Sequence, residues 1–104
     1  MQAMMVYVTA SSLEEAAKIG RTVVEKRLAA CANVLGDVRS FYWWDGKVQD
    51  DGEVALVLKT TEERIDSLIA EIKALHSYTV PCIVGLPIGT GNPAFLEWIG
   101  NETR

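Results

Sequence analysis

The sequence is short of the residues that most enzymes and nucleic-acid-binding proteins need. Its 104 residues include one histidine and two cysteines, and they contain no Gly-x-Ser-x-Gly, phosphate-loop or dinucleotide-binding motif. No pattern pairs a nucleophile with a base, so we expect a protein that is not an enzyme. Lysine and arginine total ten, do not cluster, and leave a net charge of −4, which argues against nucleic-acid partners.

Long apolar runs and cysteine frameworks are also lacking. No apolar run is long enough to span a membrane, and the first residues lack the basic, apolar and small-residue regions of a secretory signal. Two cysteines far apart in the chain do not make a disulfide framework, and reduced thiols are typical of the cytoplasm. We therefore expect a cytoplasmic protein without a membrane partner. Its length and its 49% hydrophobic content predict a single domain, residues 1–104.

The sequence does contain a regular series of strand patterns. Runs of apolar and β-branched residues, bounded by turn residues, predict four strands. These strands are expected at residues 4–9, 31–44, 47–60 and 80–86. The two middle strands are the arms of one hairpin, since they are joined by a tight Asp-Gly turn.

Helical patterns occupy the remaining segments. A capping box at residues 12–15 predicts a helix that ends near residues 29–30, with small residues on its buried face. A second capping box at residues 60–63 precedes an apolar stripe at 65–75. Asn-Pro at 92–93 begins a short C-terminal helix. The order βαββαβ plus a helix predicts an α+β, ferredoxin-like split βαβ sandwich, with the helices on one face of an antiparallel sheet.

The hairpin is unusually long for so short a chain. Its first arm, 31–44, is more than twice the usual strand length of about 5–6 residues. We expect a bulge or bend at 36–37 in the first arm and another at 50–52 in the second. A small domain cannot cover such arms, so the aromatic end is predicted to form an interface with another chain. The aromatic residues are Phe41, Tyr42, Trp43 and Trp44.

Several segments of the sequence resemble the CutA divalent-cation-tolerance family. They follow the family's order and spacing from about residue 5 to residue 99. The matching segments are 27–33, 40–47, 58–61, 75–81, 86–88, 91–93 and 96–99. The resemblance implies a homotrimer with hairpins paired between subunits. It also implies a non-catalytic function in the binding and tolerance of divalent metal ions, copper in particular.

His76 is the first candidate metal ligand. By itself, a single histidine at the end of a helix is better explained by packing or by the helix dipole than by metal binding, because no companion ligands stand at a recognised spacing. The resemblance matches it to the family's His-Pro-Tyr segment, which is associated with metal binding. This chain departs from the family by having Ser77 in place of the proline. Val8 and Leu75 stand where some members have a thiol and a second histidine.

Glu53 and Cys82 complete the predicted metal site. Glu53 matches a recurring acidic position and shares a strand face with Asp51, although such a cluster is also typical of a solvated bend. Cys82 stands where the family usually has glutamate, and a thiolate favours softer ions such as copper. Buried packing is the alternative for Cys82, and also for Cys31. We expect copper or another divalent metal ion as the ligand, and no cofactor required for folding.

Two further functions remain open. The resemblance places Trp44, Lys59 and Tyr78 at a cleft between subunits, where they would suit an anionic metabolite. The CutA trimer is similar to the PII signalling proteins, so a trimeric small-molecule sensor is the main alternative to metal tolerance. Lys59 could equally extend from a strand into solvent. A purely structural scaffold is the third possibility.

Overall fold

The four strands form one antiparallel sheet in the order β2-β3-β1-β4. The computed structural model describes residues 1–104. In it, β1 (Ala3–Ala10) lies between β3 (Lys47–Thr61) and β4 (Ile83–Pro87). The fourth strand, β2 (Cys31–Trp44), pairs with the outer edge of β3. This order and the antiparallel pairing confirm the predicted α+β class and the βαββαβ sequence of elements.

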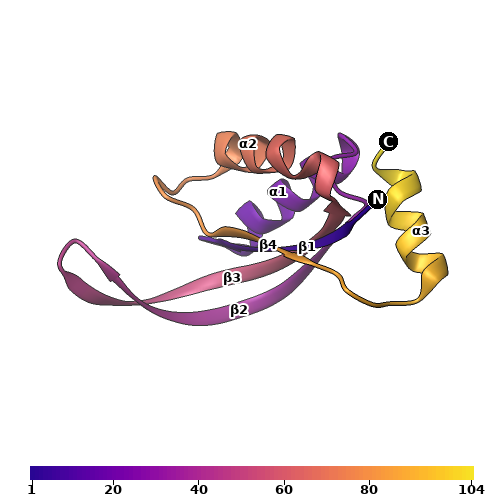
Figure 1. Ribbon diagram of the computed structural model, residues 1–104. Helices are drawn as coiled ribbons and strands as arrows, with labels where there is room; N and C mark the ends of the chain where they lie inside the picture. Colours follow the sequence, from indigo (N-terminus) through magenta and orange to yellow (C-terminus); the bar gives the residue numbers. More distant parts are fainter.

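Two helices cover one face of this sheet, as Figure 1 shows. They are α1 (Leu13–Glu25) and α2 (Ile65–Leu75), and the third helix, α3 (Pro93–Glu102), lies beside the chain's N-terminus. The core between the helices and the sheet is mainly apolar, and Val6, Leu58 and Ile72 in it are no more than 1% exposed. None of the helices has the length and apolar character to cross a membrane.

The start of α1 is as predicted, but its end is not. Ser12 accepts a hydrogen bond from the Glu15 N–H at 3.1 Å, as an N-cap should. The helix stops at Glu25, several residues before the predicted end. The Leu28 N–H donates to the Val23 carbonyl, and Arg27 takes a positive φ of 58°. This is a Schellman motif with arginine in the position that glycine usually fills, so no glycine marks the end of the helix in the sequence.

The second predicted capping box does not form. Thr60 belongs to β3, and its buried hydroxyl donates to the Leu28 carbonyl at 2.7 Å instead of capping a helix. A short 3-10 turn at Glu62–Arg64 leads into α2 without a side-chain cap. The strand continues through Thr60 because Met4 pairs with it across the sheet.

The hairpin turn and the first bulge are confirmed. Asp45 and Gly46 both have positive φ, 55° and 75°, as a two-residue type I′ turn requires. The register shifts between Val34 and Gly36, and Gly36 has a φ of 114°. The bulge predicted at residues 50–52 is wrong, because pairing is regular through that segment. The distal end of the hairpin reaches beyond both helices (Figure 1).

The predicted start of the last strand is also wrong. The strand β4 begins at Ile83 and not at Val80, so Pro81 and Cys82 belong to the preceding loop. Pro81 has no N–H to donate to a neighbouring strand, and pairing with β1 begins at Ile83, opposite Val8.

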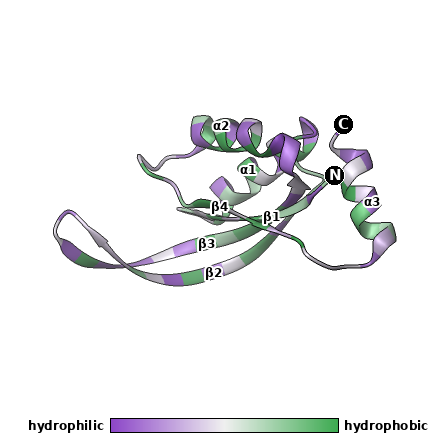
Figure 2. Ribbon diagram, in the orientation of Figure 1, coloured by the Kyte–Doolittle hydropathy of each residue, from purple (hydrophilic) through white to green (hydrophobic).

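Neither α1 nor α2 covers the second face of the sheet, and α3 covers only its end, where Ile99 packs against Ala3. The side chains of this face are largely apolar. Met5 is 37% exposed, Val84 52% and Leu86 59%, and the register places Met5 beside Leu86. Figure 2 shows that β1 and β4 are largely hydrophobic, while hydrophobic and hydrophilic stretches alternate along the hairpin. We call this surface, defined by Met5, Val84 and Leu86, the open face.

Candidate functional site

A cleft lies between the hairpin and the loop that joins α2 to β4. Its volume is about 830 Å³, and fourteen residues line it. Five of the residues singled out in the sequence are among them: Tyr42, Trp44, Glu53, Tyr78 and Cys82. The structure therefore gathers most of the predicted metal and ligand-binding residues on one cleft.

The strand register explains which hairpin residues line the cleft. Ser40 pairs with Asp51, and Tyr42 pairs with Gln49 two positions further along. Because side chains alternate along a strand, Tyr42 and Trp44 share a face with Asp51 and Glu53. The regular pairing that replaces the predicted second bulge thus aligns the two carboxylates on one side of the hairpin.

Each carboxylate of the cleft accepts a hydrogen bond from a tyrosine. The Tyr42 hydroxyl donates to Asp51 at 2.6 Å, and the Tyr78 hydroxyl donates to Glu53 at 3.0 Å. The bond to Asp51 raises the pKa of Tyr42, and burial followed by the bond to Glu53 raises the pKa of Tyr78. Both phenols therefore remain protonated donors, and the negative charge stays on the carboxylates. The sequence did not reveal either pair, since Tyr78 and Glu53 are far apart in the chain.

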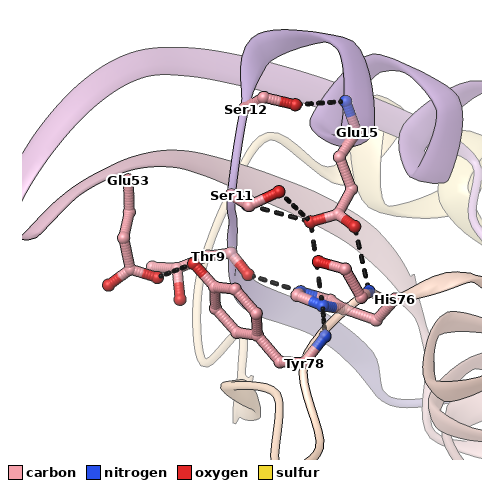
Figure 3. A network of polar contacts seen from close by, with 8 residues as sticks. Thr9, Ser11, Ser12, Glu15, Glu53, His76 and Tyr78 are labelled. Carbon is pink, nitrogen blue, oxygen red and sulfur yellow. Dashed lines mark hydrogen bonds and ion pairs between the residues drawn. The ribbon is translucent and has the colours of Figure 1, made fainter.

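His76 lies behind the cleft and does not line it. Its side chain is 0% exposed. Its Nε2 is 2.7 Å from the Thr9 carbonyl, and its Nδ1 accepts a hydrogen bond from the Tyr78 N–H at 3.1 Å. Its ring also contacts the Tyr78 ring, with centroids 4.6 Å apart. Figure 3 shows the histidine held between β1 and the loop, where it fixes the position of Tyr78.

Glu15 joins α1 to the same loop, a role that the sequence did not reveal beyond its place in the capping box. Its carboxylate accepts hydrogen bonds from the N–H groups of Ser11 and Ser77, both at 2.9 Å, and lies 3.8 Å from His76 Nδ1 (Figure 3). Burial raises the pKa of Glu15, but the hydrogen bonds from Ser11 and Ser77 outweigh it and lower the pKa from 4.5 to about 2. Glu15 is therefore a carboxylate at all ordinary pH values, and it secures the loop that carries Tyr78.

The replacement of the family's proline by Ser77 has a structural consequence. The N–H that Ser77 donates to Glu15 is a group that proline does not have. The serine thus adds a backbone hydrogen bond to the loop in this chain.

The remaining candidates lie elsewhere. Lys59 is not part of the cleft, because it pairs across the sheet with Cys31 and its ammonium group donates to the side chain of Asn33. Phe41 and Trp43 point to the opposite side of the hairpin from Trp44, and all of the hairpin aromatics are exposed. The structure thus separates Lys59 from Trp44 and Tyr78, which the sequence had grouped together.

The three predicted metal ligands do not form a compact set. Glu53 and Cys82 line the cleft, whereas both ring nitrogens of His76 have backbone partners. No three histidine, cysteine, aspartate or glutamate side chains lie together in a way that could hold a metal ion. The assignment of His76 as a ligand stays a prediction, and coordination there would break the hydrogen bonds that hold Tyr78.

Comparison with known proteins agrees with the fold. Residues 4–102 match the family described as CutA1 divalent ion tolerance protein. The chain is 47% identical over 94 residues to a divalent-cation tolerance protein CutA of Archaeoglobus fulgidus, covering 90% of this chain and 91% of that one. It is 43% identical to the chloroplastic protein CutA 1 of Oryza sativa, covering 96% of this chain but only 56% of that relative.

A solved structure extends this agreement to the arrangement of the elements. The divalent cation tolerance protein of Thermus thermophilus superimposes with a TM-score of 0.96 and 43% identity, covering 98% of this chain and 99% of that one. The similarity includes the long hairpin and the loop that form the cleft, since both lie within the matched length. The chain belongs to the CutA1 family of divalent ion tolerance proteins.

Proposed function

We propose that this protein acts in divalent-cation tolerance as a non-catalytic, cytoplasmic homotrimer that binds metal ions, copper above all, in the cleft of the hairpin. The observation that carries the proposal is the chemistry of the cleft. Two carboxylates and one thiol line it, and none of its fourteen residues is a lysine, arginine or histidine. Such a surface attracts cations, which agrees with the family's description.

The assembly is supported by the two surfaces that the chain leaves uncovered. The open face is apolar, and the hairpin carries Trp43 at 75% exposure and Trp44 at 52%. The outer edges of β2 and β4 also lack a neighbouring strand within the chain. Exposed apolar faces and free strand edges are the features that association with further copies would remove.

The proposed ligands are Glu53 and Cys82. One carboxylate and one thiolate are an incomplete coordination sphere, since four ligands are usual for zinc and cuprous sites also need more than one donor. Because no third ligand-type side chain of the same chain joins them, we propose that a second copy completes the site. His76 then acts by positioning Tyr78, and its replacement would affect the metal through the loop.

Titration of the purified protein with Cu(I) and with Zn(II), followed by calorimetry, tests this function. We expect Cys82→Ser to weaken Cu(I) binding far more than Zn(II) binding, because a hydroxyl is a poor ligand for a soft ion. The matched control is Cys31→Ser, the other free thiol, which does not line the cleft. Trp44→Asp, which we expect to weaken assembly, should also weaken metal binding if the site is shared. Equal metal affinity in all of these variants would contradict the proposal.

A small-molecule sensor is the second candidate, and the size of the cleft favours it. A volume of about 830 Å³ falls within the range of small-molecule sites. The cleft does not favour an anionic metabolite, because Lys59 does not line it and its two carboxylates would repel a negative charge. If the protein binds neither metal ions nor small molecules, a purely structural scaffold is the remaining hypothesis.

A further inference from the structure

The charge and the size of the cleft together leave room for a ligand larger than a metal ion. Asp51 and Glu53 give it two negative charges that no cationic residue of the cleft balances. The nearest charge pair on the hairpin, Arg39 with Asp50, lies on the opposite face of the strands. A bare ion would leave most of the roughly 830 Å³ empty and would find fewer than three ligand-type side chains grouped together.

Aromatic rings supply the rest of the cleft wall. Tyr7, Tyr42, Trp44 and Tyr78 all line it, from β1, the hairpin and the loop. The faces of such rings attract organic cations, and the attraction is strongest for tryptophan. The two tyrosine hydroxyls are directed to Asp51 and Glu53, so each ring stays neutral while a carboxylate beside it carries the charge. Carboxylates and aromatic rings that line the same cleft form a typical binding surface for an ammonium group.

The spacing of the carboxylates narrows the class of ligand. Asp51 and Glu53 are two positions apart on one strand face, which separates their Cα atoms by about 7 Å. We propose that the cleft binds a short aliphatic diamine, with one ammonium group at each carboxylate and the methylene chain against Tyr42 and Tyr78, whose hydroxyls contact those carboxylates. This inference concerns the same cleft as the proposed function, but it does not depend on metal binding.

Calorimetric titration with 1,4-diaminobutane in metal-free buffer with a chelator tests the inference. We expect saturable binding of one diamine per cleft that weakens as salt is added, as expected for ion pairs. The monoamine n-butylamine should bind at least about tenfold more weakly, because it can satisfy only one of the two carboxylates. Asp51→Asn and Glu53→Gln should each cost at least about tenfold in diamine affinity for the same reason.

Asp50→Asn is the matched control for these variants. It removes the same charge from the same strand, but Asp50 faces Arg39 on the opposite side of the hairpin and does not line the cleft. Its diamine affinity should equal that of the wild type. Absence of diamine binding, or an equal loss in all three variants, would overturn the inference.

Two other outcomes separate this inference from the proposed function. If Cu(I) binds and the diamine does not, the metal function stands and the diamine site is excluded. If Asp51→Asn and Glu53→Gln change only the oligomeric state measured by sedimentation, the cleft is occupied by a second copy of the chain, and the diamine site is again excluded. Diamine binding without metal binding supports the diamine site and contradicts the metal function.

Discussion

The two faces of the sheet are built from the same strands but are completed in different ways. On the helix face, Val6 and Leu58 sit side by side in the register and are no more than 1% exposed. Met5, the neighbour of Val6 in β1, points to the open face instead. It lies beside Leu86, which is 59% exposed. The chain thus covers one face with its own helices and leaves Met5, Val84 and Leu86 of the other face exposed.

This difference follows from the length of the chain, which supplies too few helices to cover both faces of the sheet. In a chain of 104 residues, α1 and α2 cover one face and α3 covers only an end of the other, and the 14-residue arm of β2 extends beyond α1 and α2. Burial of apolar surface is favourable by about 25 cal/mol per Å², so the open face contributes to stability only when another chain covers it. The cleft lies on the same side of the sheet as the open face, since Tyr7, which lines it, pairs with Val84.

The largest expected effect comes from placing the same charge on each face. Leu58→Asp should prevent folding, because an unpaired carboxylate in the core costs about 5 kcal/mol or more. Leu86→Asp should leave the fold intact and abolish the proposed assembly, since in that assembly the charge falls in the contact between copies. Circular dichroism checks the fold, and sedimentation at micromolar concentration checks the assembly.

Leu13→Asp is the control for this comparison. Leu13 is 63% exposed, close to the value for Leu86, but it lies at the start of α1 and not on the open face. It should change neither the fold nor the assembly. Dissociation of Leu13→Asp as readily as Leu86→Asp would mean that general loss of apolar surface, and not the open face, controls the oligomeric state.

A second experiment tests the network that fixes the loop of the cleft. Glu15 has a pKa of about 2 in the folded protein and an ordinary value of 4.5. A lowered folded pKa stabilises the protein above the unfolded pKa, and the contribution is lost as the pH falls through the folded pKa. Glu15→Gln should therefore be less stable than the wild type by at most about 3 kcal/mol at pH 7, with the difference shrinking between pH 4.5 and about 2.

Urea unfolding of both proteins across this pH range measures that difference. The variant Glu14→Gln is a suitable control, because Glu14 is the exposed neighbour on the same helical turn and has none of these hydrogen bonds. A gap between the wild type and Glu15→Gln that stays constant down to pH 2 would contradict the role of the charge.

The fold was predictable wherever a local signal determined it. The Asp45-Gly46 turn, the cap at Ser12 and the bulge at Gly36 each depend on a residue whose conformational preference is visible in the sequence. The predictions that failed concern positions where contacts between distant parts of the chain determine the backbone conformation. Arg27 ends α1 in a conformation that favours glycine, and Thr60 stays in the sheet because a neighbouring strand and a distant carbonyl hold it. Tertiary contacts decided both.

The cleft was predictable in part for the same reason. Alternation along a strand placed Glu53 on one face with Asp51, and the family resemblance selected Trp44 and Tyr78, which do line the cleft. The burial of His76 could not be foreseen, because its partners come from β1 and from the backbone of the loop. Every residue type has a backbone carbonyl, and nearly every type has a backbone N–H, so the sequence does not indicate which of these groups will bond to a side chain.

The smallest effect concerns Ser77, where this chain departs from the family's proline. His76 has φ −80° and ψ 143°, an extended conformation that a following proline permits. Ser77→Pro should therefore fold normally, gain about 0.4–1 kcal/mol from a less flexible unfolded state, and lose the hydrogen bond to Glu15. Because a hydrogen bond to a charged group contributes about 1.5–3 kcal/mol, we expect a net loss of about 1 kcal/mol at pH 7.

The pH dependence identifies the cause of that loss. Without the Ser77 N–H, the pKa of Glu15 should rise from about 2 toward 4.5, so Ser77→Pro should lose less stability than the wild type as the pH falls from 4.5 to 2. Ser77→Ala keeps the N–H and removes only the hydroxyl, so in urea unfolding it should lie between the two proteins. If Ser77→Ala and Ser77→Pro show the same acid dependence, the backbone N–H contributes nothing, and the hydroxyl alone accounts for the effect of the serine on Glu15.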